Sequence, residues 1–285
     1  MTGKKYELTD EKIEFAGRTL HRIKSCIDFK TISGQIVNNG DLGGYIEKYD
    51  NLSQTDKSWV FDHARVYGDA RVYGDAWVYG DARVYGDAWV YDNARVYGDA
   101  WVYGDARVCG NARVCGNACV YGNARVYGDA WVYGDASVCG DARVYGDASV
   151  CGNAWVHGDA SVCGNAKVYG NASVCGNAWV HGDACVYGNA KVYGNVRVFS
   201  DAKIAKTTEI FLAGPIGSRN DFTTFYKNKN DGISVKCGCF NGSIDDFENT
   251  VKENHNGTKH EKTYLKLIEL AKIQIEIGGK KDDVL

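Results

Sequence analysis

Proline and methionine are almost missing from this chain of 285 residues, which has one of each, Pro215 and Met1, beside 35 glycines and 19 tyrosines. A composition this skewed excludes an ordinary varied core and indicates a repeated motif. Long apolar runs are missing too: none approaches the roughly 20 residues of a membrane helix, and the polar start MTGKKYELTDEK holds no signal-peptide segment. We therefore expect a cytoplasmic protein that does not contact a membrane.

Neither sign of charge dominates the chain, whose formal net charge is −3. This balance argues against a nucleic-acid partner, because such partners are bound largely through neutralisation of their phosphates. Eleven cysteines are present, an odd number. In a protein expected in a reducing compartment, they predict free thiols and not a disulfide framework.

A six-residue unit fills the middle of the chain. An aliphatic residue recurs at every sixth position from Val60 to Ile204, in units of the form V-Y-G-[DN]-A-[RWSKC]. This period fits neither a helix nor a plain alternating strand, but it fits a short strand followed by a two-residue corner. Alanine and the next valine lie two positions apart and point inward, whereas tyrosine and the residue before valine point outward. Glycine with aspartate or asparagine suits the corner.

The pattern resembles the bacterial hexapeptide-repeat family, whose chains wind a left-handed parallel β-helix with three units per coil. The resemblance implies an all-β solenoid of about eight coils over residues 58–205. The lead-in at 41–47 and the tail motifs at 217–221 and 237–240 resemble those of phage- and prophage-associated members.

Both ends of the chain lack the repeat and are expected to cap the solenoid. Residues 1–57 predict a β-rich cap with strands around Tyr6–Leu8 and Arg18–Ile23, followed by an irregular first coil that contains Ile46 and Leu52. Residues 206–285 predict a ββαα cap with strands at Thr223–Lys227 and Ile233–Phe240, a helix from Ser243 to Asn254, and a second helix marked by Tyr264, Leu265, Ile268, Ala271 and Ile275.

The outer surface is the expected place of function, because valine and alanine fill the interior. Tyrosine, tryptophan and arginine dominate protein interfaces, so we predict a non-enzymatic binding or scaffold protein with a protein partner. The resemblance to phage proteins implies that it binds or sequesters a host component. The predicted contact residues are Trp77, Trp89, Trp101, Tyr85, Tyr103, Arg107, Arg125 and Arg143.

Two groups of residues raise the question of anion binding. Arg107, Arg125 and Arg143 are separated by three repeat units each and would form one column, which needs either corner carboxylates such as Asp105 and Asp129 or a phosphate-bearing ligand to offset repulsion. We expect the carboxylates. A turn in the tail could hold an anion through its N–H groups, although a plain connector is the favoured interpretation; its residues are Ser218, Arg219 and Asn220.

Two other functions stay open. The first is a trimeric acyltransferase, as in many hexapeptide-repeat relatives, with His157 or His181 as general base. No loop interrupts the repeat, and both histidines fall on flat faces, so we favour a protein that is not an enzyme. The second is a nucleotide-like ligand stacked on tryptophan.

We expect neither a metal nor a cofactor. Cys139, His157 and Cys175 fall in one column, but the two cysteines would be about 9.6 Å apart at the backbone, too far for one zinc ion.

Overall fold

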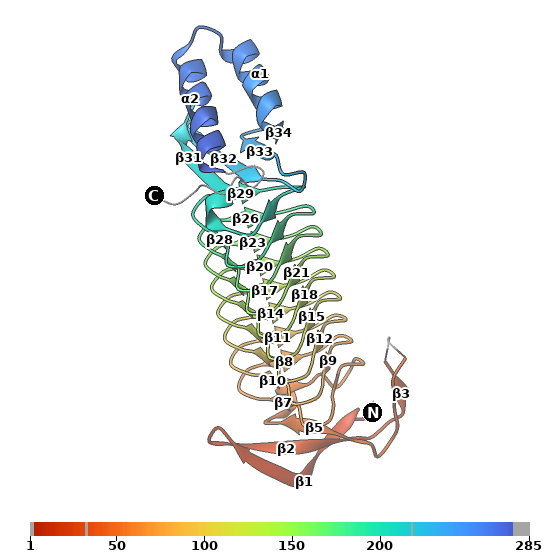
Figure 1. Cartoon of the computed structure of the whole chain (residues 1–285). Helices are drawn as coiled ribbons and strands as arrows, with labels where there is room; N and C mark the ends of the chain where they lie inside the picture. Colours follow the sequence, from red (N-terminus) through yellow and green to blue (C-terminus); the bar gives the residue numbers. More distant parts are fainter. Residues whose placement is uncertain (1–2, 32–33, 218, 276–285) are drawn as a thin grey trace.

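The computed structural model describes residues 3–31, 34–217 and 219–275. Figure 1 shows a long prism of stacked coils with antiparallel strands at one end and two helices at the other. Each coil has three short strands, and each strand pairs in parallel with the third strand after it along the chain. Val66, Val84 and Val102 are consecutive partners in this way. The chain is therefore a parallel β-solenoid, as the six-residue unit predicted.

The strands form three flat faces. Face 1 consists of β7 (Arg65–Val66), β10 (Arg83–Val84), β13 (Trp101–Val102), β16 (Cys119–Val120), β19 (Ser137–Val138), β22 (Trp155–Val156), β25 (Ser173–Val174) and β28 (Lys191–Val192). Face 2 consists of β8 (Arg71–Val72), β11 (Trp89–Val90), β14 (Arg107–Val108), β17 (Arg125–Val126), β20 (Arg143–Val144), β23 (Ser161–Val162), β26 (Trp179–Val180) and β29 (Arg197–Val198). Face 3 consists of β6 (Trp59–Val60), β9 (Trp77–Val78), β12 (Arg95–Val96), β15 (Arg113–Val114), β18 (Trp131–Val132), β21 (Ser149–Val150), β24 (Lys167–Val168), β27 (Cys185–Val186) and β30 (Lys203–Ile204).

The solenoid has about nine turns, one more than the regular repeat suggests. Val60 pairs with Val78, which is the regular separation of three repeat units. Ile46 pairs with Val66 and Leu52 bridges to Val72. In both pairs the partners are 20 residues apart in the sequence, compared with 18 for Val60 and Val78. The first coil is thus complete, with extra chain inserted between Leu52 and Val60, which makes it irregular as predicted.

The inward valines and alanines form one continuous buried core along the prism. At the corners, glycine has φ near +70°, as at Gly104 (φ 68°). A Cβ on Gly104 would lie 3.1 Å from the backbone N of Gly122 in the next coil. The corner therefore needs glycine both for its backbone conformation and for the close approach of the coils.

Tyrosines after the valines stack in columns on the outside. On face 1, Tyr67, Tyr85, Tyr103 and Tyr121 form an unbroken stack with ring centroids 4.9 to 5.0 Å apart and planes within 2° of parallel. The spacing equals the separation of neighbouring strands, about 4.8 Å, so stacking follows directly from the register. These rings shield a thin core from water.

The C-terminal cap contains four strands, not the two predicted. They are β31 (Ile210–Ile216), β32 (Asp221–Lys227), β33 (Ile233–Cys237) and β34 (Phe240–Ser243), which form one antiparallel sheet. The predicted strand Ile233–Phe240 is broken by a turn at Gly238 and Cys239, and the segment Ile210–Ile216 adds the fourth strand. The 3₁₀ turn Thr207–Glu209 leads into the sheet.

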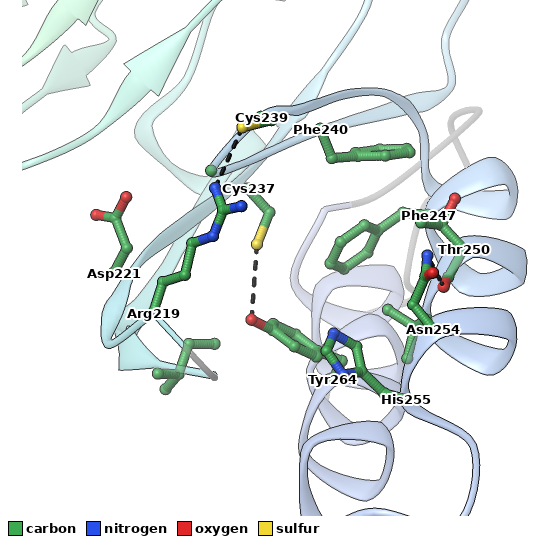
Figure 2. A pocket seen from close by; sticks show the side chains of 13 residues that line it. Arg219, Asp221, Cys237, Cys239, Phe240, Phe247, Thr250, Asn254, His255 and Tyr264 are labelled. Carbon is green, nitrogen blue, oxygen red and sulfur yellow. Dashed lines mark hydrogen bonds between the residues drawn. The ribbon is translucent and has the colours of Figure 1, made fainter.

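Two helices, α1 (Ile244–His255) and α2 (Lys259–Gln274), follow the sheet. Ser243 caps α1 by accepting a hydrogen bond from the Asp246 N–H, as predicted. Phe247 of α1 and Tyr264 of α2, both drawn in Figure 2, are buried together. Phe225 of β32 belongs to the same cluster. Within the described residues, no helix is long and apolar enough to cross a membrane.

The same cap closes the last coil. Tyr226 is fully buried against the solenoid core, and the Arg197 N–H donates to the Thr224 hydroxyl at 3.1 Å. Ala202 forms a β-bridge with Asn228. Strand β32 thus covers backbone groups that would otherwise be an open edge.

The N-terminal cap is a β-hairpin followed by short strands. Its elements are β1 (Tyr6–Phe15), β2 (Arg18–Ser25), β3 (Phe29–Lys30), β4 (Ile36–Val37), β5 (Leu42–Ile46) and the 3₁₀ turn Tyr49–Asn51. β1 and β2 contain the two strands expected from the sequence. Through β5 the hairpin extends face 1. Tyr6, Val37 and Trp59 cover the first coil and belong to its core.

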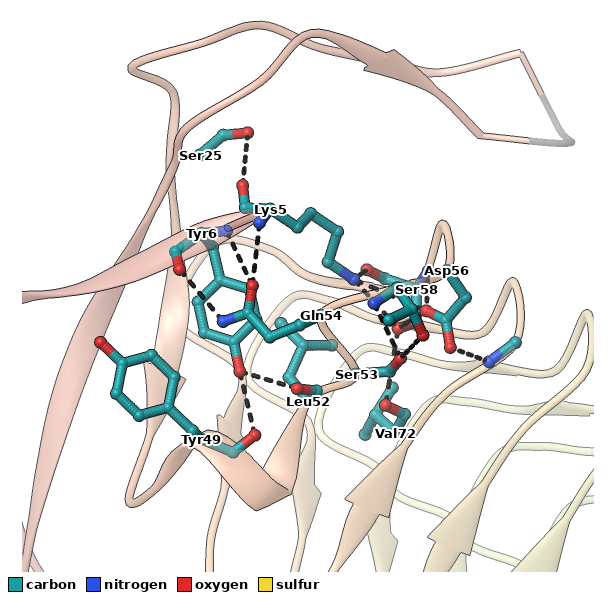
Figure 3. Close-up of polar contacts among 12 residues, drawn as sticks. Lys5, Tyr6, Ser25, Tyr49, Leu52, Ser53, Gln54, Asp56, Ser58 and Val72 are labelled. Carbon is teal, nitrogen blue, oxygen red and sulfur yellow. Dashed lines mark hydrogen bonds and ion pairs between the residues drawn. The ribbon is translucent and has the colours of Figure 1, made fainter. Parts of the chain in front are cut away.

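A buried lysine ties this cap to the first coils. The Lys5 ammonium donates to the Ser58 carbonyl at 2.8 Å and lies 3.5 Å from an Asp56 carboxylate oxygen (Figure 3). Its side chain is 3% exposed. Burial lowers the pKa of Lys5 to about 8, although Asp56 opposes the shift.

We predict a pH-dependent stability from Lys5. Below about pH 8 the lysine is charged in both folded and unfolded chains; between about pH 8 and about pH 10 only the unfolded chain keeps the proton, so the free energy of unfolding rises with pH. Guanidinium unfolding of the wild type and Lys5→Met measures this. The wild type should gain stability relative to Lys5→Met across that interval, and a constant difference would contradict the burial of Lys5.

Candidate binding sites on the solenoid and in the C-terminal cap

The predicted contact residues lie on three different faces and do not form one surface. Trp101, Tyr85 and Tyr103 are on face 1, Trp89 and the three arginines are on face 2, and Trp77 is on face 3. Trp77 is 8% exposed, since Phe61 (ring centroids 5.7 Å apart) and the Arg95 guanidinium (5.2 Å from the Trp77 ring) cover it. Trp77 therefore offers little area to a partner.

The N-terminal hairpin occupies part of face 1. Phe15 packs edge-on against Tyr67 at 5.8 Å, and the guanidinium of Arg83 lies 5.0 Å from the Phe15 ring. Tyr85 is packed against the same small cluster. The hairpin thus covers Tyr67 and packs near Tyr85, whereas Trp101 further along the same face is 37% exposed. The three predicted arginines lie together on face 2.

Most outward arginines of the first coils lie over aromatic rings. Arg71 and Arg107 both lie over Trp89, and Arg113 lies over Trp131, with guanidinium-to-ring distances of 5.0 to 5.9 Å. Such contacts satisfy the cation without a carboxylate. Arg125 and Arg143 lie over no ring in the part of the chain that the structure describes.

The expected neutralisation by corner carboxylates is wrong. Arg107, Arg125 and Arg143 are consecutive strand partners, as predicted. Among the described residues, however, no carboxylate lies within 4 Å of any of these three guanidinium groups. Asp129 instead accepts a hydrogen bond from the Asn111 side chain at 2.8 Å, because the corners form their own ladder. The arginine column therefore has no direct ion pair, while the nearby Asp92 carboxylate acts on Cys109 and Tyr91 and contributes to raising the pKa of both.

A gap in the tyrosine column lies beside these arginines. The column on face 2 runs Tyr73, Tyr91, Cys109, Tyr127 and Tyr145, with stacked pairs on each side of the cysteine. The small thiol leaves one rung of the ring stack empty. The resulting depression has a volume of about 250 Å³ and is lined by Tyr91, Arg107, Cys109, Arg125, Tyr127 and Arg143. We call it the Cys109 depression.

Three other cysteines in tyrosine columns are covered by a tryptophan. Cys115, Cys139 and Cys163 each accept a hydrogen bond at 3.2 Å from the indole N–H of the residue 16 positions later, which are Trp131, Trp155 and Trp179 respectively. All three thiols are buried. At the same offset after Cys109 the chain has Arg125, and Cys109 stays half-buried. The gap is therefore open because an arginine replaces the covering tryptophan.

The groups inside the Cys109 depression add no negative charge at neutral pH. Burial raises the pKa of the Cys109 thiol. The neighbouring Cys109 thiol and burial together raise the pKa of Tyr91 to about 12. Two neutral rings and three cations therefore surround the depression, an arrangement suited to a planar group that carries negative charge.

The two candidate catalytic histidines lie on different faces, His157 on face 1 and His181 on face 2. His157 packs on Trp155 with ring centroids 4.4 Å apart, and its Nδ1 is buried without a hydrogen-bond partner. Burial lowers the pKa of His157. His181 packs against Phe199 at 5.4 Å. Among the described residues, neither ring has a carboxylate within 4 Å to orient it as a general base.

The C-terminal cap holds a second cavity, of about 330 Å³ (Figure 2). Of the three anion-binding candidates in the tail, Arg219 lines it, Asn220 does not, and Ser218 lies outside the described residues. The sequence did not point to the remaining lining residues as a set, since they come from separate strands and helices. They include Asp221, Cys237, Cys239, Phe240, Phe247, Thr250, Asn254, His255 and Tyr264.

All eleven cysteines are free thiols. Within the described ranges no three histidine, cysteine, aspartate or glutamate side chains gather closely enough to hold a metal ion.

We predict that the tryptophan cover controls thiol access. Trp131→Ala should expose Cys115, which is 7% exposed in the intact fold, and accelerate its alkylation by iodoacetamide several-fold. Peptide mass spectrometry measures each cysteine separately, so Cys109 in the same molecule is the control and should be unchanged. Equal rates for Cys115 in the wild type and Trp131→Ala would contradict the covering role.

Known proteins resemble this chain in its repeats. A family model described as YdcK beta solenoid repeat matches residues 64–80, 76–91, 88–104, 106–122, 118–134, 136–152 and 142–158. No curated protein matches the chain. The matched repeats include the coils that form the Cys109 depression. Together with the parallel pairing of the coils, they identify a repeat-based β-solenoid, an architecture typical of scaffold and binding proteins.

Proposed function

We propose that this protein is a non-enzymatic binding scaffold that recognises an acidic, aromatic segment of a partner protein at the Cys109 depression. The observation that carries the proposal is the coincidence of an empty rung with an arginine column that has no carboxylate partner. Either feature alone would be a variation of the repeat. Together they form a surface that lacks both a ring and an ion pair for its arginines.

The spacing of the column supports an aromatic group as the occupant. Tyr91 and Tyr127 lie two rungs apart, about 9.6 Å at the backbone. Neighbouring rings in the intact columns are 4.7 to 5.3 Å apart. One ring of a partner placed over Cys109 would therefore contact both tyrosines at the distance that the stack already uses.

The charge of the column supports an acidic segment around that ring. Arg125 and Arg143 are exposed, and each guanidinium can donate a pair of parallel hydrogen bonds to a carboxylate. Arg107 keeps its contact with Trp89 and adds charge at the third rung. Because the solenoid holds these side chains on rigid strands, little ordering entropy is lost on binding.

The location of the partner follows from two further points. Eleven free thiols are typical of a reducing compartment, which supports the cytoplasm as the place of action. The resemblance of the lead-in and tail to phage-associated proteins supports a host protein as the partner. A nucleotide, which also joins a ring to negative charge, is the second candidate occupant because the same tyrosines and arginines suit it.

We predict that Cys109→Tyr abolishes binding while stabilising the fold. The new ring would complete the stack from Tyr91 to Tyr127 and fill the depression, and an aromatic pair contributes about 1 kcal/mol. A fluorescent peptide of four glutamates around one tyrosine is the probe, with affinity measured by anisotropy and stability by thermal melting.

Cys151→Tyr is the matched control, since Cys151 lies between Tyr133 and Tyr169 on face 3 without an arginine column. It should raise the melting temperature in the same way and leave the affinity unchanged. Loss of binding in both variants, or in neither, would refute the assignment.

We also predict that Arg125→Gln/Arg143→Gln weakens the peptide about tenfold or more, because it removes the charge-assisted hydrogen bonds. Arg95→Gln/Arg113→Gln on face 3 removes the same charge and should have little effect. An equal loss in both double variants would show that only net charge matters. A trimer in light scattering that is stabilised by acetyl-CoA would favour the acyltransferase instead.

A further inference from the structure

The cavity in the C-terminal cap has a charged side and an aromatic side. Figure 2 shows Arg219 on one side and Asn254, on α1, on the other. Between them lies a continuous series of ring contacts: Phe240 to Phe247 at 5.0 Å, Phe247 to Tyr264 at 5.5 Å, and Tyr264 to His255 at 5.8 Å. A cavity of about 330 Å³ with an apolar wall and a few polar groups has the composition of a small-molecule site.

The chain packs closely against Tyr264 at Gly217, two residues before Arg219. Gly217 has φ +73°, and a Cβ at this position would overlap the Tyr264 hydroxyl oxygen. Tyr264 in turn accepts a long contact of 3.8 Å from the Cys237 thiol, which itself accepts a hydrogen bond from the Thr223 hydroxyl at 3.1 Å. Glycine at 217 thus lets the chain after strand β31 approach α2.

Arg219 has hydrogen-bond donors without a partner among the described residues. One guanidinium nitrogen donates to the Cys239 thiol at 3.1 Å, and no carboxylate lies within 4 Å of the guanidinium among the described residues. Asp221 also lines the cavity, where its charge acts on Arg219, and one of its oxygens accepts a hydrogen bond from the Phe222 N–H at 2.7 Å. Guanidinium carries five N–H donors, so most of them are open to an anion.

The opposite side offers an acceptor. The Asn254 amide nitrogen donates to the Thr250 carbonyl at 3.0 Å, which leaves its side-chain oxygen to accept. This part of α1 is its last turn, where the helix dipole also favours donor groups of a ligand. The site therefore presents, in order, a cation, an aromatic wall and a hydrogen-bond acceptor.

We propose that this cavity binds a small planar aromatic anion with its carboxylate or phosphate on Arg219, its ring along Phe240, Phe247 and Tyr264, and an amino group on Asn254. The proposal is independent of the Cys109 depression, which lies on face 2 of the coils and shares no residue with it. The two anionic groups share one chemistry, and the experiment separates them.

The test uses AMP and 4-aminobenzoate as the phosphate and carboxylate probes, with adenosine, benzoate and inorganic phosphate as fragments. Binding is measured by ligand-detected NMR on the whole chain. At least one of the two probes should bind. The fragment of that probe without the anionic group (adenosine) or without the amino group (benzoate) should bind about tenfold more weakly, because it loses one polar contact. Inorganic phosphate should bind more weakly than AMP.

Alkylation of Cys239 provides a second readout. Arg219 lowers the pKa of this exposed thiol, so a ligand that takes over the arginine should slow its reaction with iodoacetamide. The nine cysteines outside the cavity serve as internal references. Arg219→Gln and Asn254→Leu should each weaken the probe about tenfold or more, whereas Arg143→Gln on face 2 should not.

Any one of the following results would overturn the proposal. These are the failure of both AMP and 4-aminobenzoate to bind at millimolar concentration, equal binding of the anion-free fragment, unchanged affinity in Arg219→Gln, or loss of binding in Arg143→Gln. Equal affinity for AMP and inorganic phosphate would remove the role of the aromatic wall and would refute the site as stated.

Discussion

Hydrogen bonds between successive coils are the constraint on which every other feature depends. The N–H groups of one coil donate to carbonyls of the next, as from Arg107 to Ala124 at 2.9 Å, and hold equivalent positions of neighbouring coils in register. A slip of one residue in this pairing would turn the side chains of a strand from one side of the sheet to the other, so the register of each column is strongly specified. A departure from the repeat therefore becomes a defect at a defined place on a face. The Cys109 depression is such a defect, bounded by rings and cations that the register supplies.

Much of the solenoid could be predicted from the sequence because its six-residue period translates directly into geometry. Val66, Val84 and Val102 align, and Arg107, Arg125 and Arg143 form a column, since both statements need only the length of one coil. The contact partners of the charged side chains could not be predicted from the period alone. Corner aspartates lie near in sequence, but side-chain amides such as Asn111 take their oxygens, and tryptophans stack on the arginines instead. Which of several possible partners a charged side chain contacts depends on rotamers and distances, and the six-residue period of the sequence gives no information on these.

The caps were less predictable than the coils. The hairpin turn at Gly238 and Cys239 lies inside an apolar-looking run that favoured a single strand, yet this turn brings Cys239 to Arg219. Likewise, nothing local in residues 1–25 indicates that Phe15 covers Arg83 on face 1. One signal for the candidate site was present in the sequence. Three cysteines in tyrosine positions are followed by a tryptophan 16 residues later, whereas Cys109 is followed there by Arg125. This difference could be interpreted only once the structure showed that the tryptophan side chain reaches diagonally to the cysteine in the neighbouring column.

The register can be measured directly from the anomalous scattering of the cysteine sulfurs in crystals of the protein. Cys115 and Cys151 fall in one column two rungs apart, and Cys109 and Cys163 fall in another column three rungs apart. With about 4.8 Å per rung, the sulfurs of Cys115 and Cys151 should be about 10 Å apart and those of Cys109 and Cys163 about 14 Å apart, both along the axis of the solenoid. Sulfur positions on different faces within either pair, or separations unrelated to whole rungs, would contradict the columns and with them the empty rung at Cys109.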